Sequence, residues 1–168
     1  MRRRQTSKKA QQCASTGYED HAVSANKEAY NYVPLELARQ FESLAALRGV
    51  SKVARGETAS TQSDGGFFET SKRVDGSIER LRNMPIRKAD PHGQTWWQRR
   101  ANFCKRHRAQ MLSRQERVVE TNGPFKGTPR RRELGMLMWQ CSNLSLDELR
   151  SMLPLVGQIV RERAAGKK

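Results

Sequence analysis

The sequence predicts an all-α fold, a small helical domain of about five helices preceded by a disordered basic N-terminal arm. In several segments, apolar residues recur three and four positions apart, as they do on one face of an amphipathic helix. Residues that favour helix ends, such as Ser, Thr or Pro before a segment and Gly after it, bracket several of these segments. No stretch shows the alternation of apolar and polar residues that is typical of a half-buried strand.

The chain is expected to divide into three parts. Residues 1–31 are polar and basic with no helical or strand period, which predicts a disordered arm. Residues 32–165 should form a single helical domain, with loops near 57–66 and 121–129 where Gly, Pro and small polar residues gather. Residues 166–168 form a polar tail.

Two helices are expected in the first half of the domain. Pro34 suits a first helical turn, and apolar residues follow at helical spacing until Gly49, so residues 34–48 should be helical. Acidic and basic residues balance in this segment, which suggests packing against the core or against a protein partner. A shorter helix is predicted over residues 75–84, where Pro85 closes the run.

The longest basic segment should be a helix over residues 96–117. Thr95 is a suitable N-cap. One side of this helix is apolar and should face the core, and it carries Trp97, Ala101, Cys104 and Met111. Charged residues cover most of the remaining circumference.

Two further helices should complete the domain. Apolar residues at helical spacing predict one over residues 129–141, which begins with three arginines. Ser145 and Glu148 form a capping box that starts the last helix, and Pro154 should kink that helix or divide it.

Positive charge is concentrated in one part of the chain. The net charge is +15, from 32 Lys and Arg against 17 Asp and Glu. Residues 96–132 hold eleven basic and two acidic residues, which gives +9, and residues 1–18 carry +5. Such a block repels itself unless an anion neutralises it, and a phosphate backbone does so while releasing counterions.

This charge predicts a nucleic-acid-binding protein, for DNA or RNA, of viral, mobile-element or chromosomal-accessory type. Arginine forks match phosphate oxygens and exposed aromatic rings can stack on bases. The alternatives are an RNA-contacting component of a large ribonucleoprotein such as a ribosome, and an adaptor or inhibitor of an acidic protein surface. The residues expected to bind nucleic acid are Trp96, Arg99, Arg100, Lys105, Arg106, Arg108, Arg114, Arg130, Arg131 and Arg132.

Catalysis is not favoured, because the chain contains no P-loop, dinucleotide fingerprint, H-E-x-x-H or G-x-S-x-G motif. No catalytic residue or cofactor is therefore assigned. The enzymatic alternative is a metal-dependent nuclease built from Asp90, His92, His107, Glu116 and Glu120. No metal site is assigned either, since the C-x-x-H spacing from Cys104 to His107 lacks a second ligand pair.

The three cysteines, Cys13, Cys104 and Cys141, are odd in number and far apart, which makes a poor disulfide framework and suggests a reducing compartment. Cys104 is expected to be a small core residue. No apolar run reaches the roughly 20 residues that span a bilayer, so no membrane partner is expected. These observations favour an intracellular location in the cytoplasm, nucleoid or nucleus, with an organelle as an alternative.

Overall fold

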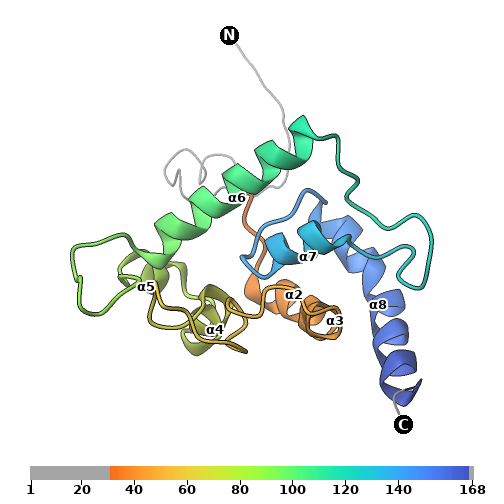
Figure 1. Ribbon diagram of the computed structural model, residues 1–168, viewed down its shortest axis with the longest axis horizontal. Helices are drawn as coiled ribbons and strands as arrows, with labels where there is room; N and C mark the ends of the chain where they lie inside the picture. The colour runs from red at the N-terminus through yellow and green to blue at the C-terminus, as the bar shows by residue number, and fades with distance from the viewer. Residues whose placement is uncertain (1–30, 167–168) are drawn as a thin grey trace. The chain divides into compact units, whose positions relative to one another are not determined.

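The computed structural model describes residues 31–166, which belong to one compact unit (Figure 1). The regular elements of these residues are helices, joined by loops that contain only isolated bridges, so the predicted all-α class is confirmed. No helix in this range is long and apolar enough to cross a membrane. The predicted disordered arm lies outside the described residues. The elements are α2 (Leu35–Ala38), η3 (Arg39–Phe41), α3 (Glu42–Leu47), α4 (Phe67–Arg73), α5 (Ile78–Arg82), α6 (Trp96–Ser113), α7 (Arg131–Leu137) and α8 (Leu146–Gly166).

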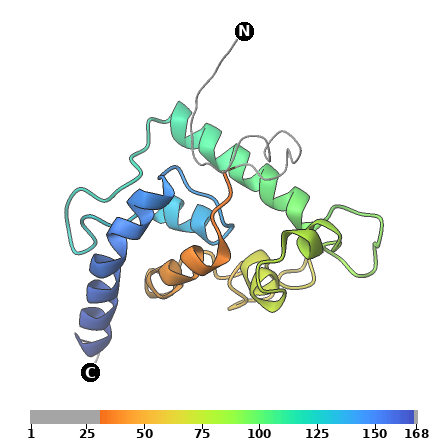
Figure 2. The same cartoon turned by 180° about the vertical axis from the view of Figure 1, so that it is seen from behind.

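Helix α6 lies across one side of the domain and the other helices gather beneath it (Figures 1 and 2). Helices α4 and α5 lie below its N-terminal half, and α7 lies below its C-terminal half. Helix α8 runs along the edge of the domain next to α7 and packs against α3. The main apolar core forms where α2, α3, α7 and α8 meet.

The predicted helix over 34–48 is present, but it is divided into α2, η3 and α3. Its apolar face is fully buried in the core and includes Leu37, Ala38, Phe41, Leu44 and Ala45. Gly49 ends the run as expected, with φ of +67°, a conformation that glycine adopts without steric cost.

Helix α4 was not expected from the sequence. It begins after Gly66, where a side chain would have no room, because a Cβ atom there would lie 1.9 Å from the carbonyl oxygen of Val53. Glu69 closes the first turn by accepting a hydrogen bond from the Gly66 backbone nitrogen, 3.2 Å away. Helix α5 falls within the predicted 75–84 segment.

The two longest helices match the sequence pattern well. Thr95 caps α6 as predicted, since its Oγ1 accepts from the Gln98 backbone nitrogen at 3.2 Å. The helix nevertheless ends at Ser113, four residues before the predicted end at 117. Ser145 and Glu148 form the capping box of α8, and Pro154 neither divides that helix nor ends it.

Candidate functional site: a disulfide in the domain core

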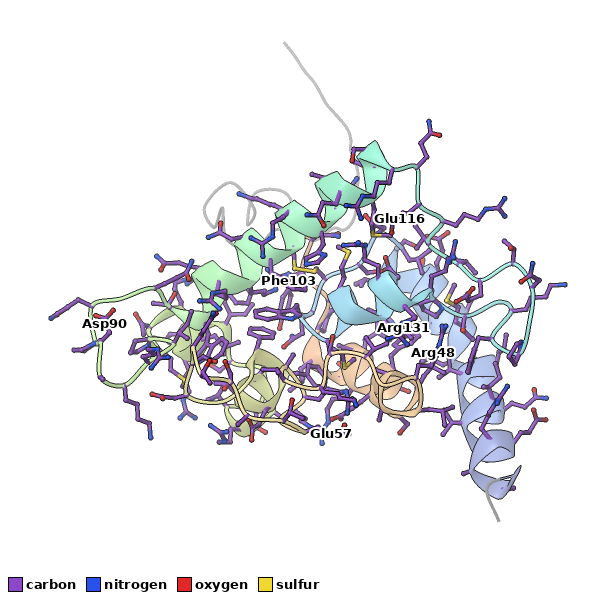
Figure 3. The ribbon with its side chains drawn as sticks, viewed as in Figure 1. Arg48, Glu57, Asp90, Phe103, Glu116 and Arg131 are labelled. Carbon is purple, nitrogen blue, oxygen red and sulfur yellow. A yellow bond between two sulfur atoms is a disulfide. The ribbon has the colours of Figure 1, made fainter. Side chains whose placement is uncertain are left out.

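A disulfide bond joins Cys104 of α6 to Cys141, which follows α7 (Figure 3). The two Cα atoms are 6.3 Å apart, within the usual range for a disulfide. Neither cysteine has any solvent exposure. The bond therefore crosses the inside of the domain and fixes α6 to the chain that leaves α7.

The apolar stripe of α6 brings Cys104 to this position. As predicted, Trp97, Ala101, Cys104 and Met111 are all buried on one side of the helix. Residues three or four positions apart share a helix face, so a cysteine on the stripe must face the core. Cys104 is thus a core residue, as expected, but it is not a free thiol.

A tight helix end brings Cys141 to the same place. The Cys141 nitrogen donates to Met136 O at 3.0 Å, and the Gln140 nitrogen donates to Leu137 O at 2.9 Å. These two bonds are the pattern of a Schellman motif, whose penultimate residue takes a left-handed conformation. Gln140 has φ of +56°, which is uncommon for a residue with a side chain. The reversal turns Cys141 back beneath α6.

Hydrogen bonds to Gln140 offset the strain of that conformation. Its carbonyl oxygen accepts from the Val33 backbone nitrogen at 2.8 Å. Its side-chain nitrogen donates to the Tyr32 hydroxyl and to the Val33 carbonyl, each at 3.1 Å, while Ser71 Oγ donates to its side-chain oxygen. The side chain is fully buried, so each of these bonds satisfies a group that has no access to water.

A buried arginine reaches the same carbonyl group. Arg100 has no solvent exposure and donates to Gln140 O at 2.8 Å. Its guanidinium lies 4.7 Å from the ring centroid of Trp97 and 5.2 Å from that of Tyr32. Burial lowers the pKa of Arg100 to about 9, which leaves it charged at neutral pH, and burial also raises the pKa of Tyr32. The aromatic faces partly replace the water that the cation has lost.

A buried carboxyl group holds the chain on the other side of Cys141. Glu133 accepts hydrogen bonds from Ser142 Oγ, from the Asn143 backbone nitrogen at 3.0 Å and from Asn143 Nδ2 at 3.0 Å. Burial raises the pKa of Glu133, although these hydrogen bonds oppose the rise. Residues 140–143 are thus fixed by side chains on both sides of the disulfide.

The chemistry open to this disulfide follows from its burial. Thiol–disulfide exchange requires a thiolate to reach one of the sulfur atoms in line with the bond. Both sulfurs lie in the core, so attack requires the domain to open locally. With the two cysteines 37 positions apart in the sequence, the bond stabilises the fold by about 4 kcal/mol in the loop-entropy description. Its geometry suits a structural bond.

The structure disperses the residues that were expected to bind nucleic acid. Two of them are wrong as surface contacts, because Trp96 is 3% exposed and Arg100 is completely buried. Trp96 packs in an aromatic cluster with Phe67 and Trp139. Both residues face inward on the first two turns of α6.

The other predicted residues lie in two places. Along α6, Arg99 donates to Gln94 Oε1 at 3.0 Å, Lys105 and Arg106 are exposed, and Arg108 is half-buried. The second place is the start of α7, where ion pairs join the arginines to the loop after α6. These pairs are Arg130–Glu120 at 3.7 Å and Arg132–Glu116 at 3.0 Å, while Arg131 donates to the Arg48 carbonyl. Arg114 lies instead at the C-cap of α6, and it also pairs with Glu116, at 3.7 Å.

The residues considered for a nuclease do not all converge: His107, Glu116 and Glu120 line one cleft, whereas Asp90 and His92 lie in the loop before α6. Asp90 lies in the loop before α6 and Glu116 in the loop after it, at opposite ends of that helix (Figure 3). Cys104 and Cys141 are bonded to each other, so neither supplies a thiolate to a metal ion. Within residues 31–166 no three His, Cys, Asp or Glu side chains are grouped as metal ligands would be.

The disulfide is the feature that sequence reasoning missed. The view that the cysteines are a poor disulfide framework is wrong for Cys104 and Cys141. A signal was nevertheless present, because both residues sit on the apolar stripes of neighbouring predicted helices. Two cysteines that face one core are within reach of each other if the helices pack face to face.

Comparison with known proteins adds the decisive observation. No curated protein matches the chain. Residues 32–161 match the family described as Mimivirus sulfhydryl oxidase R596-like, C-terminal domain. This family, named after a sulfhydryl oxidase, and the internal disulfide contradict the prediction of a nucleic-acid-binding protein, which is therefore wrong. Since the match spans more than half of its residues, the chain belongs to the Mimivirus sulfhydryl oxidase R596-like C-terminal domain family.

Proposed function

We propose that this domain serves thiol oxidation as the accessory domain of a sulfhydryl oxidase, and that it binds or positions proteins without carrying electrons itself. The observation that supports this proposal is the placement of the disulfide within a domain of this family. Cys104 and Cys141 are both buried. A disulfide that relays electrons has to meet another thiol, and this one faces the core.

Thiol oxidation sets clear requirements. Two thiols become one disulfide, and two electrons and two protons pass to an acceptor. The enzyme therefore needs a cysteine pair that substrate can reach, commonly one at C-x-x-C spacing with a lowered pKa. The three cysteines of this chain are far from that spacing. We therefore expect another domain to perform the thiol–disulfide exchange with the substrate.

The geometry of the domain suits an accessory role. Its disulfide and the buried groups around Gln140 hold α6 and α7 in a fixed relation. A rigid surface loses little conformational entropy on binding, so it docks a partner at low cost. An electron carrier, in contrast, would need its sulfurs at the surface.

The proposal can be tested with the sulfhydryl oxidase catalytic domain from the same source. Oxygen consumption is measured with reduced ribonuclease A and with dithiothreitol, with and without this chain. We expect the chain to lower KM for the reduced protein by about tenfold, or about 1.4 kcal/mol, and to leave the kinetics with dithiothreitol unchanged. Unchanged kinetics with both substrates would contradict an accessory role.

A second measurement separates an accessory domain from an electron carrier. During turnover the mixture is quenched with iodoacetamide, and alkylation of each cysteine is followed by mass spectrometry. We expect Cys104 and Cys141 to remain unmodified while substrate is consumed. Their alkylation during turnover would show that the disulfide is reduced and reformed, and the proposal would then be wrong.

A further inference from the structure

An arginine-lined cleft opens between the end of α3, the C-terminal half of α6 and the start of α7. Its volume is about 630 Å³, within the range of about 300–1,000 Å³ typical of small-ligand sites. Five arginines and two glutamates line it, which leaves three positive charges uncompensated. The charged or aromatic lining residues are Arg48, Phe103, His107, Glu116, Arg117, Glu120, Arg130, Arg131 and Arg132.

The fold brings these charges together from separate parts of the sequence. Figure 3 shows Arg48 and Arg131 close to each other beneath α7, with Glu116 above them. Arg131 donates to the Arg48 carbonyl, which fixes two guanidinium-bearing residues on one wall. Like charges held close together in a partly enclosed cleft repel each other, and an anion would relieve that repulsion.

The glutamates neutralise only part of the cluster. Glu120 accepts from Arg48 at 3.0 Å and lies 3.7 Å from Arg130. Glu116 accepts from Arg132 at 3.0 Å. In the described part of the chain, no ion pair joins either Arg117 or Arg131 to a carboxylate. Both side chains are exposed. Arg131 uses one N–H for the Arg48 carbonyl, and its remaining donors and those of Arg117 can face a ligand.

A histidine and an aromatic ring also line the cleft. Arg132 approaches His107 Nδ1 at 2.8 Å, so a neutral imidazole would carry its proton on Nε2. The Phe103 ring stacks on Trp139 with centroids 4.4 Å apart and contacts His107 at 4.0 Å. Phe103 is thus packed against two other rings, which leaves polar contacts as the main means of recognition.

We propose that this cleft binds a compact, multiply charged oxyanion, such as the phosphate chain of a small molecule. Guanidinium groups offer paired N–H donors that fit phosphate oxygens. The charges line a recess of limited volume, which suits a compact group. Inorganic pyrophosphate is the simplest probe with that chemistry.

Isothermal titration calorimetry of the full chain with pyrophosphate at constant ionic strength tests this inference. We expect saturable binding at one site, and a loss of at least tenfold in affinity in the Arg117→Ala/Arg131→Ala variant. The control variant is Arg80→Ala/Arg161→Ala, which removes the same charge from exposed positions on α5 and α8. We expect its affinity to stay within twofold of the unmodified chain.

The outcomes are distinct. Absence of saturable binding, or equal weakening in the two double variants, would overturn the inference. If Arg131→Ala disturbs the fold, Arg117→Ala alone is decisive, because that exposed side chain makes no ion pair in the described residues. Titrations with tripolyphosphate and with ATP then distinguish two classes of ligand. Tighter binding of ATP than of tripolyphosphate assigns the site to nucleotides, and equal affinity for the two assigns it to the phosphate chain alone.

Discussion

Removal of the disulfide provides a quantitative test of its structural role. The perturbation is Cys104→Ala with Cys141→Ala, compared with the oxidised parent, both carrying Cys13→Ala to prevent exchange with a third thiol. The bond closes a loop across 37 residues, and the loss of this constraint on the unfolded chain costs about 4 kcal/mol.

The expected change in melting temperature follows from the size of the domain. Residues 31–166 should unfold with an entropy of about 0.3 kcal/mol per kelvin near 60 °C. A loss of about 4 kcal/mol then lowers Tm by about 14 °C. Differential scanning calorimetry at one protein concentration gives this value directly.

A matched control separates the bond from its packing. The parent that is reduced while unfolded and refolded in a reducing agent keeps both sulfur atoms but lacks the covalent bond. The difference in Tm between this sample and the alanine variant therefore measures the cost of the cavity that the missing sulfur atoms leave. A fall in Tm of less than about 5 °C in both samples would refute the loop-entropy reasoning. It would also mean that the surrounding hydrogen bonds hold residues 140–143 without the bond.

Three other measurements test the buried groups. Burial raises the pKa of Glu133, so the stability that its protonated form contributes is present below the ordinary value of about 4.3 and is lost as pH rises. The Glu133→Gln variant does not ionise at this position. Its urea midpoint should therefore rise relative to that of the parent as pH increases above about 4.3. Arg100→Met should cost about 3 kcal/mol or more in urea unfolding, whereas Arg99→Met, on the same helix but partly exposed, should cost less than about 0.5 kcal/mol; equal losses would contradict the importance of burial. Burial and the charge of Arg132 lower the pKa of His107, so its NMR titration should have a midpoint below the ordinary value of about 6.5 and should move upward in Arg132→Gln; an unchanged midpoint would exclude that coupling.

The sequence predicted the helix class and the starts of helices better than their ends. Starts were visible because Thr95 and Ser145 are standard capping residues. The ends of α6 and α7 were missed because left-handed residues at helix termini are usually glycine, whereas Gln115 and Gln140 take that conformation here. Local hydrogen bonds and packing override the usual preference at those positions.

The function of the charged residues could not be read from composition. Net charge gives the excess of basic over acidic residues, and it does not show which basic side chains are buried or paired. Arg100 became a core residue, and Arg132 became the partner of Glu116. The disulfide was equally hidden, because the contact of Cys104 with Cys141 depends on how two helices pack.

The bridge between Tyr32 and Cys141 has a mechanical consequence. Any pull on the chain that precedes residue 31 enters the domain at this point. The force acts first on the hydrogen bonds between Val33 and Gln140. It is then carried by the disulfide of Cys141, the residue after Gln140. The force is therefore distributed over α6 and α7, so the domain should resist mechanical unfolding from its N-terminal side.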